Sequence, residues 1–492
     1  MGPVMSGTCS STTSAELECD VVVIGGGAVG ENVAGTVAGA GLSVTLVEAE
    51  LLGGECSYWA CMPSKALLRT PQAVADARRL PGVIASVDPA AVLGRRTRFT
   101  SNWDDTGQVA WVEGVGAIVL RGYGRLAGER VVDVATPDGG HVPVRARYAV
   151  VLATGSVPVT PQIAGLDAVE HWCSREATSA TEIPARLGVL GGGVVGCEMA
   201  LAFARLGSHV VLIHRGPRLL AAAEPVASDR VAAGLRDAGV DLRLGIGIDS
   251  VHAADGTTVL QLPNDTVEVD RLLVATGRRP ATDDLGLDTI GAAEVPFEVD
   301  DTGLLHGDWL YAVGDVNGRA PLTHQGKYQA RITGHAIATR AAGRDLDLAP
   351  WGADVATADH HAVPQVVFTD PEVAWVGRTA DAARHEGLDV RVIDIDFAVA
   401  GTALHGDGWS GRAVAVVDNR RDVLVGLTFV GPAVAELLHA ATIAVVAEVP
   451  LTRLWHAVPA YPTLSEIWLR LLEADRARPS SRTDTRKSAR RV

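Results

Sequence analysis

Short, continuous apolar runs followed by glycine-rich turns dominate the hydrophobic pattern of this chain. In CDVVVIGGG, at 19–27, four consecutive apolar residues indicate a strand that is buried on both faces of a sheet. A stretch of small residues follows and ends at Gly41, which predicts a helix. LSVTLVEAE, at 42–50, then predicts a second strand that ends at Glu48. This order of elements predicts a parallel α/β unit.

The same pattern occurs again 166 positions later, where LGVLGGGVVGCEMA begins at Leu187, its helix ends at Gly207, and HVVLIHR follows. The two turns carry glycines at matching positions: Gly25, Gly27 and Gly30, then Gly191, Gly193 and Gly196. Such glycines allow a tight turn, a close approach of backbone N–H groups to a pyrophosphate, and packing of helix on strand. The helix N-terminus adds partial positive charge. The duplication therefore predicts two dinucleotide sites; the alternative is two structural glycine turns.

The residue at the end of each second strand distinguishes the two predicted sites. In the first copy it is Glu48, whose carboxylate can accept hydrogen bonds from ribose hydroxyls. In the second copy the same register holds His214, followed by Arg215 and Arg218. Arginine binds a 2′-phosphate that a carboxylate would repel. The first site therefore fits an unphosphorylated adenosine ribose and the second fits NADPH rather than NADH, unless the two arginines are simply solvated.

A pair of cysteines follows the first nucleotide unit directly. Cys56 and Cys61 are five positions apart in LLGGECSYWACMPSKALLR, so the chain must coil back for them to meet. MPSKALLR predicts a helix beginning near Pro63, which would place Cys61 beside a helix N-terminus, where thiolates are stabilised. In a reducing compartment such a pair is expected to cycle between thiol and disulfide. The surrounding sequence offers no further metal ligands.

Composition narrows the class of protein. A chain of 492 residues exceeds one domain, and shares of 47% apolar and 21% charged residues are typical of a soluble globular protein. The net charge of −15 gives no general electrostatic reason to bind nucleic acid. No apolar run approaches a membrane span, and the first 18 residues lack the features of a secretion signal, which predicts a cytoplasmic protein. Six cysteines exclude a disulfide-built scaffold.

With these motifs the chain resembles the FAD-dependent pyridine nucleotide–disulfide oxidoreductases, the family of dihydrolipoamide dehydrogenase, glutathione reductase and mercuric reductase. The resemblance covers about residues 19–473. Besides the glycine turns it rests on six motifs: GGECSYWACMPSK at 53–65, LATGS at 152–156, VATGRRP at 274–280, YAVGD at 311–315, PQVVFTDPEVAWVG at 364–377 and YPTLSE at 461–466.

The resemblance implies an α/β fold with two Rossmann-like dinucleotide-binding domains, for FAD and NAD(P), and an α+β C-terminal dimerisation domain. The implied boundaries are 19–156 and 280–348 for the FAD domain, 157–279 for the NAD(P)H domain and 349–475 for the dimerisation domain. Residues 1–18 and the basic segment 476–492 are expected to be disordered tails. Because the C-terminal motif of relatives completes the partner's site, a homodimer is implied.

The resemblance also implies site residues. Cys61 would face the flavin as the charge-transfer thiolate, Cys56 would be the outer thiol, and Lys65 would lie near flavin N5 and pair with Glu198. A lysine here is notable because the chain has only three, Lys65, Lys327 and Lys487; the alternative is an ordinary salt bridge. The implied cofactor-binding residues are Gly25, Gly27, Gly30, Glu48, Lys65, Thr154, Gly155, Gly191, Gly193, Gly196, His214, Arg215, Gly277 and Asp315.

The C-terminal motif departs from the family pattern. Disulfide reductases of this family have His-Pro-Thr-x-x-Glu, with the histidine as proton shuttle, whereas this chain has Tyr461 there and keeps Glu466. Tyrosine is neutral at pH 7 and cannot readily act as a base. His456 is a possible substitute. A tyrosine is similar to mercuric reductase, yet that enzyme delivers metal through a C-terminal cysteine pair, and this chain has no cysteine after Cys197.

Three interpretations follow. The first is an enzyme that passes electrons from NADPH through FAD and the cysteine pair to a small acceptor such as a quinone, a metal ion or a non-standard disulfide. The second is an orthodox dihydrolipoamide dehydrogenase or small-disulfide reductase with a substituted shuttle, and the third is a flavin electron-transfer or redox-sensing subunit. Bulky Tyr58 and Trp59 between the cysteines predict an apolar substrate approach, unless they pack in the core.

Overall fold

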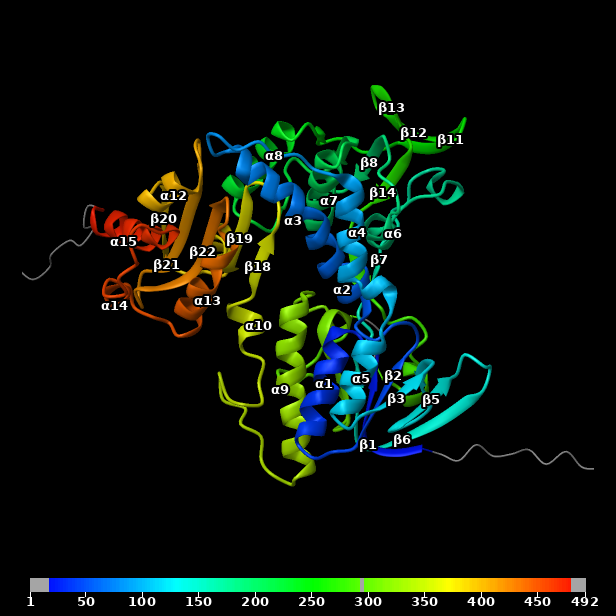
Figure 1. Ribbon diagram of the computed structural model, residues 1–492. Helices are drawn as coiled ribbons and strands as arrows, with labels where there is room; N and C mark the ends of the chain where they lie inside the picture. Colours follow the sequence, from blue (N-terminus) through cyan, green and yellow to red (C-terminus); the bar gives the residue numbers. More distant parts are fainter. Residues whose placement is uncertain (1–16, 293–295, 479–492) are drawn as a thin grey trace, which may run out of the picture. The chain divides into compact units, whose positions relative to one another are not determined.

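The computed structural model describes residues 17–292 and 296–478, which divide into two compact units (Figure 1). The first unit consists of residues up to 63, of 96–159 and of 277–359, and the second of 64–95, of 160–276 and of those from 360 on. Most of the two predicted tails lies outside the described residues. The described chain extends slightly into both, since strand β1 begins at Leu17 and helix α15 ends at Arg476.

A mostly parallel sheet forms the centre of the first unit. Its strands are β1 (Leu17–Ile24), β2 (Val44–Glu48), β3 (Ile118–Arg121), β4 (Tyr123–Leu126), β5 (Val131–Ala135), β6 (His141–Leu152), β16 (Leu304–His306) and β17 (Leu310–Ala312). The order is β16-β17-β6-β1-β2-β3, and β4 and β5 extend β6 as an antiparallel branch. β17, β6, β1, β2 and β3 run parallel. The apolar run Val21–Ile24 is buried, as the sequence predicts for a strand covered on both faces.

Two helices lie side by side against this sheet, α1 (Ala28–Gly39) and α9 (Thr323–Ala341) (Figure 1). They approach closely because glycines face the neighbouring helix: a Cβ at Gly334 would lie 2.8 Å from Thr36, and one at Gly326 would lie 2.5 Å from Val29. The shorter elements of the unit are α2 (Gly54–Tyr58), α5 (Thr106–Gly114), β7 (Ser156–Pro158) and β15 (Arg278–Pro280). Glycines of α9 thus allow it to pack closely on the predicted helix α1.

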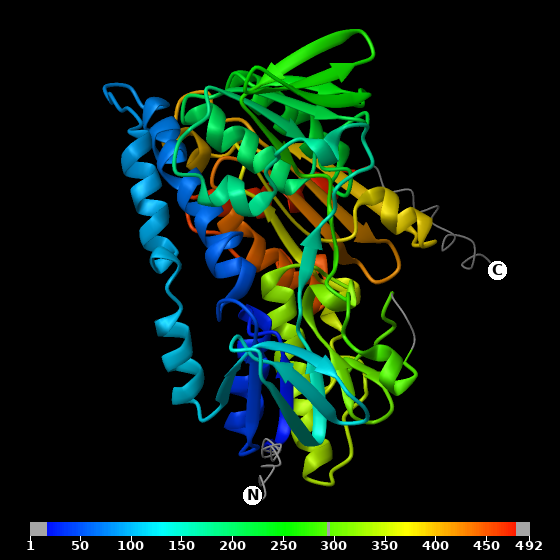
Figure 2. The ribbon, with the colours of Figure 1, turned by 90° about the vertical axis from the view of Figure 1, so that its right-hand side faces the viewer.

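The second unit repeats this construction. A parallel sheet has the order β10-β9-β8-β14, with β8 (Arg186–Leu190), β9 (His209–His214), β10 (Asp241–Leu244) and β14 (Arg271–Val274). An antiparallel sheet of β11 (Ser250–Ala254), β12 (Thr257–Leu262) and β13 (Asp265–Val269) is seen in green in Figure 2. The helices of this region are α6 (Ser174–Ser179), α7 (Val194–Arg205) and α8 (Pro225–Asp237). Helix α7 is continuously buried from Gly196 to Phe203.

An antiparallel sheet of order β18-β19-β22-β21-β20 completes the second unit. Its strands are β18 (Pro364–Val367), β19 (Glu372–Gly377), β20 (Val390–Asp396), β21 (Arg412–Asp418) and β22 (Val423–Gly431). The accompanying helices are α11 (Ala380–His385), α12 (Ala400–His405), α13 (Leu438–Val446), α14 (Leu451–Leu454) and α15 (Ile467–Arg476). Two parallel α/β regions and one antiparallel region are the α/β plus α+β architecture that the sequence predicts.

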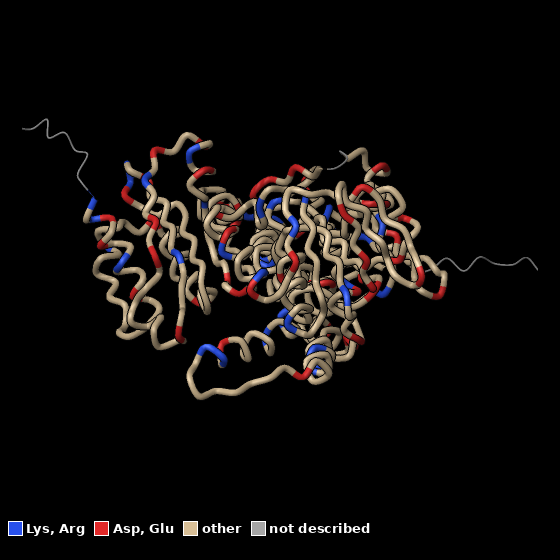
Figure 3. Tube along the Cα trace, turned by 90° about the horizontal axis from the view of Figure 1, so that it is seen from above, with Lys and Arg blue, Asp and Glu red and all other residues tan. Residues whose placement is uncertain are grey.

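Three helices continue along the chain from one unit into the other: α3 (Cys61–Arg78), α4 (Pro89–Phe99) and α10 (Ala358–His361). Helix α3 begins at Cys61, two residues before the predicted start at Pro63. Acidic and basic positions are interspersed along the traces of both units (Figure 3), in agreement with the many arginine–carboxylate pairs. No helix among the described residues is long and apolar enough to cross a membrane.

Candidate active site

The first glycine turn leaves no room for side chains on its inner side. Gly25 has φ of +102°, and a Cβ there would lie 2.4 Å from the carbonyl oxygen of Ala153. A Cβ at Gly30 would lie 1.9 Å from the carbonyl oxygen of Gly25. At Gly27, the N-cap of α1, a Cβ would have its nearest neighbour only at 3.9 Å, so the helix N-terminus has space in front of it. This cradle fits a pyrophosphate held by backbone N–H groups.

Glu48 closes the turn from the adjacent strand. Its Oε2 accepts a hydrogen bond from the Gly26 N–H at 2.7 Å, and its Oε1 accepts one from the Glu50 N–H at 2.7 Å. Burial raises the pKa of Glu48, and these two hydrogen bonds oppose that rise. Beside the carboxylate lies a cavity of about 300 Å³ whose lining includes Gly25, Tyr123 and Thr154. The cavity and the carboxylate together fit the adenosine end of FAD.

A chain of polar contacts continues from this cavity within the first unit. The Thr154 hydroxyl donates to the carbonyl oxygen of Ala281 at 2.7 Å. The Ser156 hydroxyl donates to Asp315 Oδ2 at 2.6 Å and accepts from Arg278 Nε at 2.8 Å. The two glycines predicted to bind cofactor beside these residues, Gly155 and Gly277, both have positive φ and open space at the Cβ position. The carboxylate of Asp315 is therefore held in one orientation.

The second glycine turn repeats the first. A Cβ at Gly191 would lie 2.2 Å from the carbonyl oxygen of Ala275, and one at Gly196 would lie 2.0 Å from that of Gly191. Gly193 is the N-cap of α7 and has open space. His214 takes the place of Glu48, because its Nδ1 accepts a hydrogen bond from the Gly192 N–H at 3.2 Å.

The cationic residues around His214 differ in how firmly they are held. Accepting at Nδ1 requires the neutral imidazole with its proton on Nε2, and burial lowers the pKa of His214, which favours that form. Arg218 donates to the carbonyl oxygens of Ala221 and Ala223 at 2.9 and 3.3 Å. Arg215 is exposed. The positive charge available at this strand end therefore comes from the two arginines.

The two cysteines of the redox pair are both thiols. Cys56 lies in α2, and Cys61 is the first residue of α3. A hydrogen bond to Cys61 and burial raise the pKa of the Cys56 thiol. Cys61 Sγ lies 3.3 Å from the hydroxyl of Thr323, the first residue of α9. Two mutually hydrogen-bonded thiols can be oxidised to a disulfide and reduced again.

Lys65 lies one turn further along α3 and pairs with Glu198 of α7, as expected. Lys65 Nζ donates to Glu198 Oε2 at 2.7 Å, and Glu198 Oε1 accepts from the Phe368 N–H at 3.0 Å. The Lys65 ammonium also lies 5.0 Å from the centre of the Phe368 ring. The carboxylate is almost fully buried, whereas the ammonium is partly exposed. Both oxygens of Glu198 are thus occupied, which fixes where the ammonium lies.

Comparison with known proteins assigns the family. The model of the pyridine nucleotide-disulphide oxidoreductase family matches residues 19–331, and the model of its dimerisation domain matches residues 363–471. The chain belongs to this family. It is 33% identical to a dihydrolipoyl dehydrogenase of Thermus scotoductus, over 92% of this chain and 97% of the relative. It is 32% identical to a mercuric reductase of Acidithiobacillus ferrooxidans, over 89% of this chain and 79% of the relative.

Among solved structures, the chain resembles the Cu(II) complex of the HOCl-induced flavoprotein disulfide reductase RclA from Escherichia coli. The TM-score is 0.80 at 25% identity, and the match covers 93% of this chain and 99% of RclA. Membership makes the chain a flavin-dependent pyridine nucleotide–disulphide oxidoreductase, which uses FAD and a pyridine nucleotide. The family's dimerisation domain supports a homodimer.

The C-terminal residues of the predicted site lie in the second unit. The Tyr461 side chain is exposed, and so is His456. Glu466 is buried and accepts a hydrogen bond from the Gly401 N–H at 3.3 Å. Among the described residues no hydrogen bond joins Tyr461 to Glu466. The glutamate is therefore fixed by the backbone of α12, while the tyrosine is open to solvent.

Of the two bulky residues between the cysteines, Tyr58 packs in the core, whereas Trp59 is only half-buried. Tyr58 is buried, its hydroxyl donates to the carbonyl oxygen of Asp104 at 3.4 Å, and half-buried Trp59 lies 5.7 Å from its ring. Thr323 and Phe368 are contacts of the site that sequence reasoning missed. Phe368 lies inside the PQVVFTDPEVAWVG motif, which was a usable signal. Thr323 had no signal beyond its place before a helical stretch.

Proposed function

We propose that this oxidoreductase passes electrons from NADPH, through FAD and the Cys56–Cys61 pair, to a small acceptor: a quinone, a metal ion or a non-standard disulfide. The observation that carries the proposal is the pair of hydrogen-bonded thiols, Cys56 in α2 and Cys61 at the start of α3. FAD, when bound, would accept a hydride from the nicotinamide and pass the electron pair on.

Each thiol has a separate role in this proposal. Cys61, at the helix N-terminus and in contact with the Thr323 hydroxyl, is the thiolate that faces the flavin. Cys56 is the outer thiol, which attacks the acceptor or delivers electrons to it. The hydrogen bond to Cys61 and burial raise the pKa of Cys56, which favours its protonated form. Lys65, held by Glu198, would supply a positive charge to the flavin when FAD is bound.

The identity of residue 461 supports an acceptor that needs little proton transfer. An exposed tyrosine, neutral at pH 7, stands where a disulfide reductase has its histidine. The relatives include a mercuric reductase, and the RclA structure is a Cu(II) complex, so metal ions are within the chemistry of similar proteins. A second candidate, small-disulfide reduction with another shuttle, is favoured by the relatives named dihydrolipoyl dehydrogenase.

NADPH is proposed as the reductant because of the second strand end. His214 presents an Nε2–H donor, and Arg215 and Arg218 supply the positive charge for a 2′-phosphate. At the equivalent position of the first site, the Glu48 carboxylate fits ribose hydroxyls.

An anaerobic screen tests the proposal. NADPH oxidation is followed with a quinone, with Cu(II) or Hg(II) thiolate complexes, with glutathione disulfide and with lipoamide. We expect turnover with at least one of the first two classes and loss of metal turnover in Cys56→Ser. Cys56→Ser should show long-wavelength thiolate–flavin absorbance without reduction, and Cys61→Ser should not. A protein that turns over none of these acceptors without an added protein partner would instead fit a redox-sensing subunit.

Tyr461→His tests the shuttle directly. A positioned acid–base group contributes about 10²–10⁴ in rate, so a histidine oriented by Glu466 should raise turnover of small disulfides substantially. Quinone turnover should stay within about twofold, because it needs no such group. Tyr461→Phe is the matched control and should raise neither rate. Glutathione or lipoamide turnover by the unmodified enzyme at the scale of a dedicated reductase would contradict the proposed acceptor class, and His456→Ala would then be examined.

A further inference from the structure

A closed ring of hydrogen bonds lies beyond Lys65 and Glu198 in the second unit. Its members come from three elements. Helix α3 contributes Gln72 and Asp76, and Arg79 follows directly after its last residue; helix α7 contributes Arg205, and the segment before β19 contributes Asp370. The ring contains two carboxylates and two guanidinium groups and so has no net charge.

Each member of the ring is hydrogen-bonded to two others. Arg79 donates from Nη2 to both oxygens of Asp370, at 2.7 and 2.6 Å, and from Nη1 to Asp76 Oδ1 at 2.8 Å. Gln72 Nε2 donates to the same Asp76 oxygen at 2.9 Å. Arg205 closes the ring, because its Nη1 donates to Gln72 Oε1 at 2.6 Å and its Nη2 donates to Asp370.

The Lys65–Glu198 pair and the ring each link α3 to α7, and we call these two links the first and the second rung. The two rungs are separated by the same number of residues on both helices. Gln72 follows Lys65 by seven residues on α3, and Arg205 follows Glu198 by seven residues on α7. Seven residues are about two turns, or roughly 10.5 Å, so the rungs hold two helices in one register. The same short segment closes both rungs: the Phe368 N–H donates to Glu198, and Asp370 accepts from Arg205.

The second rung is needed because α3 is weakened between the two. Pro71 lies inside the helix, where it removes one backbone hydrogen bond and favours a bend. The α3 backbone alone therefore does not fix the position of Lys65 relative to the C-terminal half of the helix. Helix α7 contains no proline and links the two rungs without interruption.

Asp370 is the centre of the second rung. Its side chain is 6% exposed, and although burial opposes ionisation, the charges of Arg205 and Arg79 hold its pKa below the usual value. The buried carboxylate is shared by an arginine at the end of α3 and an arginine of α7, so it links the two helices. Its removal would take away the carboxylate between the two guanidinium groups and leave Arg79 with Asp76 as its counter-charge.

We propose that Asp370 is a positioning residue: together with Arg79 and Arg205 it fixes the register of α3 on α7 and thereby places the Lys65 ammonium. What that ammonium does beside the flavin rests on the proposed function. Asp370 itself touches neither substrate nor cofactor in this proposal.

The first test is Asp370→Asn in the flavin-loaded enzyme. A displacement of about 1 Å can cost on the order of 10² in rate, so kcat should fall about 10-fold to 10²-fold while KM for NADPH stays within about twofold. The thiolate–flavin absorbance of the NADPH-reduced enzyme should fall by about half or more, because it depends on the placement of α3. In a Lys65→Met background, Asp370→Asn should cause no further loss of kcat, since both changes act through one ammonium.

Asp475→Asn is the matched control for a general loss of stability. Asp475 accepts two hydrogen bonds from Arg391, at 2.7 and 2.9 Å, as Asp370 does from Arg79, but it lies on α15 and touches neither α3 nor α7. It should destabilise the protein without changing the thiolate–flavin absorbance. Circular dichroism and thermal unfolding compare the stability of the two variants.

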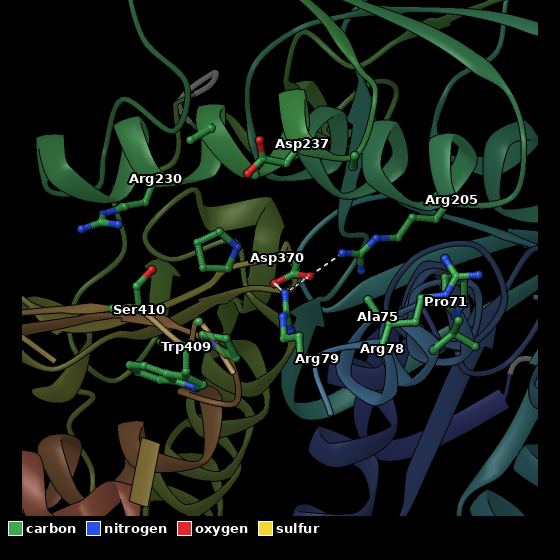
Figure 4. Close-up of a pocket in the computed structure, with 18 of the residues that line it drawn as sticks. Pro71, Ala75, Arg78, Arg79, Arg205, Arg230, Asp237, Asp370, Trp409 and Ser410 are labelled. Carbon is green, nitrogen blue, oxygen red and sulfur yellow. Dashed lines mark hydrogen bonds and ion pairs between the residues drawn. The ribbon is translucent and has the colours of Figure 1, made fainter. Parts of the chain in front are cut away.

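A second variant covers the case in which Asp370→Asn does not fold. Arg79, Arg205 and Asp370 line a cavity of about 710 Å³, shown in Figure 4 with Arg79 and Arg205 reaching Asp370 from different sides. Guanidinium ions can therefore enter beside Asp370 in Arg79→Ala. Millimolar guanidinium should restore the thiolate–flavin absorbance and kcat of Arg79→Ala, and should leave Asp475→Asn unchanged.

Two sets of results separate this inference from the proposed function. If the unmodified enzyme shows no thiolate–flavin absorbance, the proposed function is wrong. If the unmodified enzyme shows it, the positioning role is overturned by any of three results: Asp370→Asn keeps the absorbance and kcat, its loss adds in full to that of Lys65→Met, or guanidinium does not restore Arg79→Ala.

Discussion

The two nucleotide turns share one backbone design and differ in the side chains that complete it. In both copies the first and last glycines of the turn face carbonyl oxygens that a methyl group would meet at 1.9–2.4 Å. In both copies the second strand ends with an acceptor for the N–H of the second residue of the turn. Glu48 accepts from Gly26 in the first copy, and His214 accepts from Gly192 in the second. The backbone is therefore dictated by sterics, while the acceptor at the strand end is interchangeable and sets the charge offered to the ligand.

The first turn of the helix differs as well. Glu31 of α1 corresponds to Cys197 of α7, 166 positions later. Glu31 is partly buried with Oε1 lacking a hydrogen-bond partner, and burial raises its pKa to about 7, opposed by Lys327. Cys197 is fully buried, and its thiol faces the carbonyl oxygen of Gly192 at 3.6 Å. A position that is inert in the second copy is thus titratable in the first.

The largest effects should come from the paired substitutions Gly30→Ala and Gly196→Ala. Each places a methyl group against a backbone carbonyl that cannot move, at a cost of about 1–3 kcal/mol or more in the fold of the turn. We expect Gly30→Ala to purify without stoichiometric flavin, and Gly196→Ala to keep flavin and lose NADPH binding about 10-fold to 10²-fold. Absorbance of bound flavin and titration with NADPH measure these losses.

Gly39→Ala is the control for these substitutions, because it lies in α1 with nothing within 4 Å of a Cβ. It should leave both cofactors bound. Equal loss of flavin from Gly30→Ala and Gly196→Ala would mean that the two turns do not hold separate dinucleotides.

Exchanging the strand-end chemistry should have the next largest effect. His214→Glu combined with Arg215→Ala gives the second site the acceptor of the first, and removes charge-assisted contacts worth about 1.5–3 kcal/mol each. The ratio of kcat/KM for NADPH to that for NADH should fall about 10-fold or more, mainly through KM. Arg218→Ala should have a smaller effect, since carbonyl oxygens of its own loop already hold Arg218. An unmodified enzyme that uses both nucleotides equally would refute this assignment.

The smallest effect concerns Glu31 and pH. Burial raises the pKa of Glu31 from 4.5 to about 7, so the folded state holds an extra proton between these values. Stability of the flavin-free protein should therefore fall as pH rises through this window. Glu31→Gln removes that loss. The free energy of unfolding of Glu31→Gln relative to that of the unmodified protein should therefore grow by on the order of 1–3 kcal/mol between pH 5 and 8.

Cys197→Ala provides the comparison in the second copy. Burial raises the pKa of the Cys197 thiol, so it stays protonated throughout this range. Its substitution should change the free energy of unfolding by the same amount at every pH. Denaturant unfolding at pH 5, 6.5 and 8 measures both variants; a pH-independent difference for Glu31→Gln would contradict the raised pKa.

Local pattern was sufficient to predict the elements that carry chemistry. The apolar runs of β1 and β8, the glycine turns and the strand ends at Glu48 and His214 are encoded within about 30 residues each, because buried parallel strands and tight turns restrict composition strongly. The start of α3 at Cys61 rather than Pro63 is a boundary that such patterns define poorly.

Contacts across long separations left no local signal. The pair of Lys65 with Glu198, 133 residues away, was predicted only through the family resemblance. The contact of Cys61 with Thr323 spans 262 residues, and that of Arg205 with Asp370 spans 165. Asp370 stands in a recognisable motif, but its two arginines are ordinary members of an arginine-rich chain. Only the folded arrangement of α3, α7 and the segment before β19 brings Asp370 and the two arginines together.

The neutral His214 imidazole has a consequence for how the enzyme responds to its solvent. Because the imidazole contributes a hydrogen bond and no charge, long-range attraction for a 2′-phosphate comes from the guanidinium groups, and Arg215 is exposed. The screening length of salt falls from about 10 Å at 0.1 M to about 3 Å at 1 M. The proposed discrimination between NADPH and NADH is therefore expected to weaken as ionic strength rises. The first site, where the Glu48 carboxylate would meet uncharged ribose hydroxyls, should retain its flavin in the same solutions.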